Sequence, residues 1–136
     1  MKPKKYVEYW ENGNVRLEQW KMSNGKLHRE DGPVISRYYE TGNKECEQWF
    51  KNGECHREDG PSYTDWDEEG NIKKEMWEID GELHREDGPA EIWYNEDGSI
   101  DEVVYYINDE ELTEEEWKIA KLPDTKIKRA LYDSPK

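Results

Sequence analysis

Long apolar runs, cysteine and phenylalanine are all scarce in this chain. No segment approaches the roughly 20 apolar residues of a membrane-spanning helix, and the N-terminal stretch 1–5 lacks the apolar run of a secretion signal. Only 32% of the 136 residues are hydrophobic, with one Phe and two Cys. These shortages argue against a membrane protein and against a disulfide-stapled secreted domain. We expect one cytoplasmic domain with a thin core.

The sequence also lacks the familiar catalytic patterns. It contains no P-loop, no Rossmann glycine pattern, and no Ser/His/Asp or Cys/His constellation. We therefore expect no enzyme, no catalytic residue and no cofactor.

Charge of one sign is abundant. The chain has 34 Asp and Glu against 20 Lys and Arg, and its net charge is −14. Such a composition leans toward disorder, but seven Trp and nine Tyr at recurring positions indicate an ordered protein. Like-charge repulsion disfavours direct DNA binding and anionic membranes, so the expected partner is a protein with a basic surface.

A seven-residue motif occurs three times with a 28-residue spacing, which is typical of stacked repeats. Its copies are 27–33 (LHREDGP), 55–61 (CHREDGP) and 83–89 (LHREDGP). The residues assigned to this structural repeat are His28, Arg29, Asp31, Gly32, Pro33, His56, Arg57, Asp59, Gly60, Pro61, His84, Arg85, Asp87, Gly88 and Pro89.

The segments between the motifs read as β-hairpins. The predicted strands are Lys5–Trp10, Val15–Lys21, Val34–Tyr39, Lys44–Lys51, Ser62–Trp66, Ile72–Ile79, Ala90–Tyr94 and Ile100–Ile107. Asn-Gly and Asp-Gly turns supply the positive φ angles that tight hairpins need. The predicted fold is mainly β: stacked antiparallel hairpin repeats at about 5–32, 33–60, 61–88 and 89–112, forming a meandering sheet, with a helical cap at 113–136.

The cap is expected where a fourth motif is missing. Thr113 followed by Glu116 forms a capping box, which predicts a helix over about Glu114 to Ala120, with Trp117 packing against the last hairpin. A second short helix is predicted over Thr125–Tyr132. Such a unit closes the open edge of a repeat array.

The recurring pattern Trp-x-x-(x)-Asn/Asp-Gly-x-Leu-His-Arg-Glu-Asp-Gly-Pro, followed by Leu-Thr-Glu-Glu-Glu-Trp, covers nearly the whole chain. It resembles a family of small HREDGPA-type β-hairpin repeat proteins, often grouped with MORN-like repeats, that occurs in bacteriophages and giant viruses. The resemblance implies a stacked hairpin array and a phage origin. It carries over no catalytic residue.

The repeated histidines admit two interpretations. With the neighbouring Glu and Asp they could ligate a metal or act as acid–base groups. However, histidines three strands apart would lie about 14 Å from one another, too far to share an ion. We therefore favour a repeated structural corner, in which Asp-Gly forms the turn, Pro begins the next strand, and Arg and Glu pair with neighbouring copies.

Aromatic and cysteine positions complete the expectations. Trp20, Trp49, Trp77 and Tyr105 hold equivalent positions and are interpreted as a stacking ladder. Cys55 occupies a Leu position of the motif, so it is interpreted as a small apolar residue, and a Cys46–Cys55 bridge is the less favoured alternative.

Function is expected where the copies differ, on acidic turns and irregular tryptophans. The candidate partner-binding residues are Asp65, Asp67, Glu68, Glu69, Glu96, Asp97, Asp109, Glu110, Glu111, Trp10, Trp66 and Trp93. The favoured hypothesis is a phage-encoded inhibitor, anti-CRISPR-like, that mimics nucleic acid and engages a basic surface of a CRISPR or other defence nuclease as a monomer or low oligomer. Alternatives are a scaffolding repeat protein and a small metal-dependent hydrolase using the repeated histidines.

Overall fold

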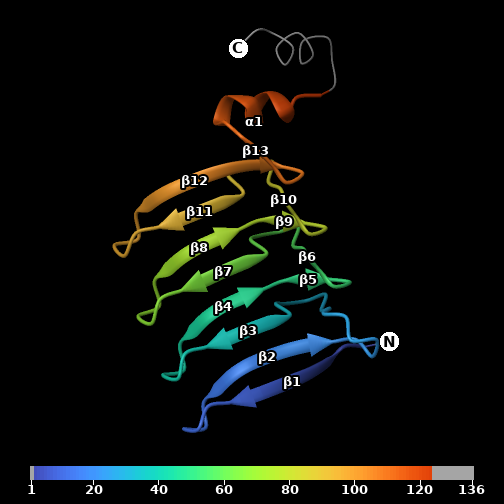
Figure 1. Ribbon diagram of the computed structural model, residues 1–136, viewed down its shortest axis with the longest axis vertical. Coiled ribbons are helices and arrows are strands. Elements are labelled where there is room, and N and C mark those ends of the chain that lie inside the picture. Colours follow the sequence, from blue (N-terminus) through green and yellow to red (C-terminus); the bar gives the residue numbers. More distant parts are fainter. Residues whose placement is uncertain (1, 124–136) are drawn as a thin grey trace.

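A computed structural model describes residues 2–123 and shows one continuous antiparallel sheet built from hairpins (Figure 1). Nine strands follow one another across it: β1 (Lys4–Tyr9), β2 (Val15–Lys21), β3 (Ile35–Tyr38), β4 (Lys44–Gln48), β7 (Tyr63–Trp66), β8 (Ile72–Met76), β11 (Glu91–Tyr94), β12 (Ile100–Ile107) and β13 (Glu110–Leu112). Two small ribbons, β5 (Phe50–Lys51) with β6 (Glu54–Cys55) and β9 (Glu78–Ile79) with β10 (Glu82–Leu83), extend from one end of the strands. The predicted mainly β, hairpin-connected architecture is confirmed.

Two of the predicted strands are interrupted, so the expectation of continuous strands over Lys44–Lys51 and Ile72–Ile79 is wrong. The break falls at Trp49 and at Trp77. The N–H of Trp49 donates to the Ser62 carbonyl in the main sheet (2.7 Å), whereas its C=O accepts from the His56 N–H (3.0 Å). The chain therefore leaves the main sheet at each tryptophan and continues into a small ribbon.

Tight turns at the ends of these ribbons have the expected chemistry. Asn52 and Gly53 both have positive φ (51° and 85°), as do Asp80 and Gly81 (49° and 82°). Positive φ at both central residues is the requirement of a two-residue hairpin turn. The Asn-Gly and Asp-Gly dipeptides thus act as predicted.

A β-bulge recurs near the other end of each long hairpin. The pairing register shifts between Glu8 and Tyr9, Arg37 and Tyr38, Asp65 and Trp66, and Trp93 and Tyr94. One extra residue on the facing strand moves the following side chains to the other face of the sheet. The bulges explain why aromatic residues fail to alternate strictly along the sequence.

The core is a narrow line rather than a layer. Val34 and Ala90 are fully buried and Ser62 is 1% exposed. Each follows the proline of a motif, and each joins two strands: the Val34 N–H donates to Gln48 O (2.8 Å) while its C=O accepts from Trp20 (2.9 Å). Small residues suit this line because backbone passes on both sides.

The last strand is followed by a helix, α1 (Glu114–Ala120), as predicted. The capping box is present: Thr113 accepts from the Glu116 N–H, and the Glu116 side chain accepts from the Thr113 N–H. Trp117 is 6% exposed; its indole N–H donates to Arg85 O (2.8 Å), and its ring centroid lies 4.7 Å from that of Tyr105. The second predicted helix, Thr125–Tyr132, lies outside the described residues.

Both cysteines are free thiols, Cys46 buried and Cys55 half-buried. Burial raises the pKa of each thiol to about 11. Between residues 2 and 123 there is no helix with the length and apolar character needed to cross a bilayer.

Candidate functional site

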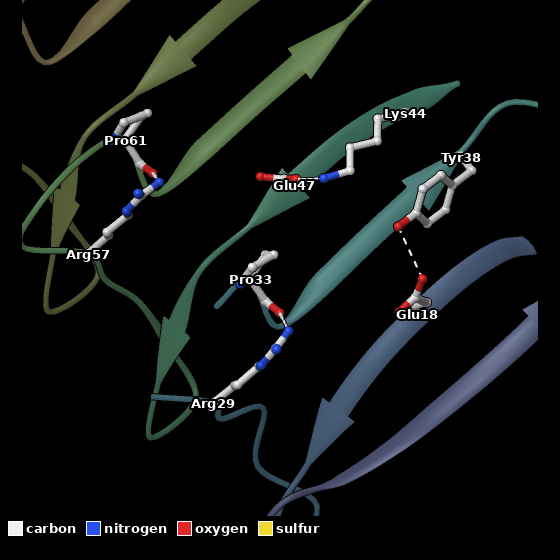
Figure 2. Close-up of polar contacts among 8 residues, drawn as sticks. All are labelled: Glu18, Arg29, Pro33, Tyr38, Lys44, Glu47, Arg57 and Pro61. Carbon is white, nitrogen blue, oxygen red and sulfur yellow. Dashed lines mark hydrogen bonds and ion pairs between the residues drawn. The ribbon is translucent and has the colours of Figure 1, made fainter. Parts of the chain in front are cut away.

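The three motif copies place their arginines between a tryptophan ring and a glycine. The guanidinium carbon of Arg57 lies 3.9 Å from the Trp49 ring centroid, and the equivalent distance is 4.6 Å for Arg29 over Trp20 and 3.8 Å for Arg85 over Trp77. Each guanidinium also bonds within its own motif: Arg57 Nε donates to Asp59 (2.9 Å). Figure 2 shows Arg29 and Arg57 directed at the carbonyls of Pro33 and Pro61, at 3.3 and 3.2 Å.

Two expectations about the motif are therefore wrong. Each arginine pairs with the aspartate of its own copy (Asp31, Asp59 or Asp87), not with a neighbouring copy. The motif glycines also have no positive φ; a Cβ on Gly60 would lie 2.8 Å from the Arg57 guanidinium carbon. Glycine is needed for close approach of the arginine, because any side chain would displace it.

Each motif histidine makes the contact between neighbouring hairpins. Nδ1 of His28 accepts from the Asn52 N–H (3.1 Å), that of His56 from the Asp80 N–H (3.0 Å), and that of His84 from the Asn108 N–H (3.1 Å). All three donors have positive φ in the following turn. The imidazole thus joins each motif to the next hairpin turn.

This hydrogen bond conflicts with metal binding by the same ring. An Nδ1 that accepts a hydrogen bond carries no proton, so the neutral ring has its proton on Nε2, which cannot then be a metal ligand. Successive motifs are separated by two main-sheet strands, not three, which places the histidines about 9.5 Å apart. Within residues 2–123, no group of three or more His, Cys, Asp or Glu is arranged to hold an ion.

The interpretation of the equivalent aromatics as a stacking ladder is also wrong. Trp20, Trp49 and Trp77 each receive an arginine on the ring, and in the described part of the chain the ring–ring contact is the one between Tyr105 and Trp117. Trp117 takes the place at Tyr105 that arginine takes in the earlier copies. Cation–π contacts, not aromatic stacking, therefore connect this row.

An acidic groove lies on the sheet away from the motifs. It has a volume of about 650 Å³. Its lining includes five carboxylates, two lysines and several aromatics: Asp65, Asp67, Glu68, Glu69, Glu96, Lys73, Lys74, Tyr39, Tyr63, Trp93 and Tyr94, with Ile72 and Asn95. We call this the acidic groove. It brings together six of the predicted partner-binding residues, five of them acidic and the sixth Trp93.

Cross-strand pairing assembles the floor of the acidic groove. Asp65 lies opposite Lys74, and Lys74 lies opposite Trp93. The Lys74 ammonium lies 4.1 Å from the centroid of the Trp93 ring, which is 39% exposed. Tyr63 donates to Asp65 Oδ2 (3.0 Å), while the buried Oδ1 of Asp65 has no hydrogen-bond partner within residues 2–123.

The groove has a negative electrostatic field. Burial raises the pKa of Tyr39, and the surrounding carboxylates of Glu45, Glu68, Asp65 and Asp67 raise it further because they oppose a second negative charge. The hydrogen bonds from backbone N–H groups, chiefly that of Asn71, lower the pKa of Asp67. Asp67 is therefore held in its charged form.

The carboxylates on the other side of the sheet have internal partners instead. Glu18 accepts from Tyr38 (3.1 Å) and pairs with Lys5 (2.9 Å), and Glu47 pairs with Lys44, as Figure 2 shows. Glu75 accepts from Tyr94. The acidic surplus available to a partner is consequently concentrated in the groove.

The remaining candidate residues do not join the groove. Trp10 is half-buried and donates to Tyr38 O (3.1 Å), and Trp66 is also half-buried. Asp97 accepts from Ser99 in its own turn (2.9 Å). Asp109 accepts from the Leu83 N–H (3.0 Å), so it holds the last turn in place, while Glu110 and Glu111 are exposed on β13.

Sequence reasoning missed the lysines and tyrosines of the groove. Lys73 lies at the bulge opposite Asp65 and Trp66, and Lys74 lies in register with Trp93. No local pattern announces these positions, because they depend on which residues face one another across strands.

Comparisons with known proteins add no family to this description. No protein-family model matches the chain, and neither the curated proteins nor the solved structures contain a match.

Proposed function

We propose that this chain is a non-enzymatic binding protein whose acidic groove engages a basic segment on a partner protein. The observation that carries the proposal is the lining of the groove: five carboxylates against two lysines around the exposed Trp93 ring. Aromatic side chains in a charged surround are typical of binding hot spots. A cationic side chain of the partner would meet both the carboxylates and the aromatic faces.

The partner class follows from charge. A chain with a net charge of −14 is repelled by nucleic acid but attracted to the surfaces that bind nucleic acid. We propose a mimic of a phosphate backbone that occupies such a surface, and the partner expected from the resemblance is a nuclease of a host defence system. Electrostatic steering would speed the encounter.

The repeat organisation contributes rigidity to this proposal. We infer that the hairpins form an array of 28-residue units, supported by the threefold recurrence of the Arg–Trp contact and of the histidine bond to the next turn. Fixed charges lose little entropy on binding, which favours a rigid surface over a flexible acidic tail.

The test is a binding assay of the purified chain against a panel of defence nucleases, with a salt titration. Affinity should fall steeply as ionic strength rises, because the contact is electrostatic. The triple variant Glu68→Lys, Glu69→Lys, Glu96→Lys should lose binding by at least about tenfold. Those three side chains lie in the groove, and no hydrogen bond or ion pair is recorded for them.

The matched control changes net charge equally but outside the groove: Glu11→Lys, Glu40→Lys, Glu82→Lys, all exposed. It should retain most of the affinity. Equal loss in both triple variants would show a diffuse charge effect and refute the groove as the site. Binding that is indifferent to salt would refute electrostatic mimicry.

A further inference from the structure

The two edges of the main sheet differ in how they end. β13 is only three residues long and leads directly into α1, which packs on β12 through Trp117 (Figure 1). β1, at the opposite edge, is six residues long, and in the described part of the chain no strand lies outside it. An uncovered strand of this length is a template for pairing with another strand.

The hydrogen bonds of β2 show which backbone groups of β1 face outward. The Trp20 N–H donates to Val34 O (2.9 Å), and the Trp20 C=O accepts from the His28 N–H (3.3 Å). Neither group is left for Lys5, which lies directly opposite Trp20. Because antiparallel pairs alternate, the N–H and C=O groups of Lys5 and Val7 point away from β2.

We propose that a second copy of this chain pairs antiparallel with β1, with Lys5 opposite the partner's Val7. This pairing is two-fold symmetric, so Val7 lies opposite the partner's Lys5 as well. Each of these pairs exchanges two backbone hydrogen bonds. The two nine-stranded sheets become one continuous sheet.

Charge complementarity selects this register. It places Lys4 opposite the partner's Glu8, Glu8 opposite the partner's Lys4, and Tyr6 opposite the partner's Tyr6. These three residues share one face of β1, and Tyr6 is 55% exposed. Lys4 and Glu8 are exposed and make no recorded ion pair within residues 2–123, whereas Lys5 is engaged with Glu18 (2.9 Å).

Neighbouring registers fit less well. A shift by one residue sets an outward-facing residue against an inward-facing one, which cannot form the ladder. A shift by two places either Lys5 opposite the partner's Lys5, or Val7 opposite the partner's Val7 with both Lys4–Glu8 pairs lost. Like charges directly opposite are destabilising, and the opposite charges stabilise.

The experiment is sedimentation equilibrium of the full chain over a wide concentration range near physiological salt, which screens the net charge beyond about 8 Å. The mass should rise from 16.4 kDa toward twice that value. Val7→Pro removes an outward N–H that no group in the monomer accepts, so the fold should persist, as circular dichroism would show, while dimerisation is lost. A constant mass of 16.4 kDa for the unmodified chain, or a dimer that survives Val7→Pro, would overturn the proposal.

Charge reversal tests the register. Lys4→Glu alone and Glu8→Lys alone should each weaken association roughly tenfold, and the double variant should restore it, because the pairs are re-formed with exchanged partners. The control Glu11→Lys makes the same charge change on an exposed turn and should leave association unchanged. Failure of the double variant to restore the dimer would refute this register.

A cross-link supplies an independent readout. Tyr6→Cys should form an intermolecular disulfide, since the two copies of residue 6 would face each other in a non-hydrogen-bonded pair with Cα atoms about 4.5 Å apart. Tyr9→Cys, also exposed, should not, because its symmetry mate lies too far away. The native thiols will not interfere near pH 8, since burial raises the pKa of both to about 11. Equal cross-linking of the two variants would contradict the pairing.

Discussion

At the residue scale, arginine and glycine of the motif depend on each other. The Arg57 guanidinium is stacked on Trp49, bonded to Asp59 and in contact with Gly60, where a Cβ would lie 2.8 Å from its central carbon. Cation–π and charge-assisted contacts at a half-buried site contribute of the order of 1 kcal/mol each. The motif is therefore a packing unit whose conserved-looking charge is mostly used internally.

Substituting Gly60 tests this dependence. Gly60→Ala should lower the free energy of unfolding by about 1–3 kcal/mol, because the new methyl group displaces the guanidinium. In an Arg57→Ala background the same substitution should cost clearly less, since the clash is gone. Urea denaturation of the four proteins measures the coupling, and an equal cost in both backgrounds would contradict this role of the glycine.

At the element scale, α1 closes the array by replacing an arginine with a tryptophan. Trp117 covers Tyr105 and satisfies the Arg85 carbonyl, while the capping box satisfies N–H groups at the start of the helix. The helix is short, so its stability comes from this packing more than from its own hydrogen bonds.

Two substitutions at Trp117 separate packing from hydrogen bonding. Trp117→Ala should cost about 3–5 kcal/mol, the usual range for removing a buried Trp. Trp117→Phe keeps a ring against Tyr105 but loses the indole N–H to Arg85 O, and should cost about 1–3 kcal/mol. Thermal unfolding followed by circular dichroism compares them; similar losses would mean that ring packing is not the main contribution of this residue.

At the scale of the whole molecule, global stability should depend on motif carboxylates. The hydrogen bond from Arg57 lowers the pKa of Asp59, and that from Arg85 lowers the pKa of Asp87, both below the ordinary value of 3.8. A carboxyl whose folded-state pKa is depressed stabilises the fold above its unfolded pKa, and this contribution is lost as pH falls through the folded value.

The double variant Asp59→Asn, Asp87→Asn isolates this contribution. At pH 7 it should unfold at a lower temperature than the unmodified chain, and the difference should shrink as pH falls below about 4. Comparing two proteins with nearly the same net charge cancels most of the general effect of protonating the other carboxylates. Calorimetry at several pH values measures it, and a difference that stays constant from pH 7 to pH 3 would contradict the prediction.

Local chemistry in the sequence determined the hairpins and the cap. Asn52-Gly53 and Asp80-Gly81 can adopt positive φ, so their turns follow from two residues alone. Thr113 and Glu116 likewise specify the start of α1 through bonds within one helical turn. These features involve neighbours in the chain, and they were predicted correctly for that reason.

Only the tertiary structure decided what the charged residues contact. Arg57 selects Trp49, Asp59 and Pro61, and Lys74 lies against Trp93, because strand register and the recurring bulges set which side chains meet. The same spacing in sequence is compatible with several registers, and a shift of one residue reverses every face. The sequence therefore specified hairpins and an acidic balance, while the pairing of strands placed that acidity in one groove and left one edge of the sheet uncovered.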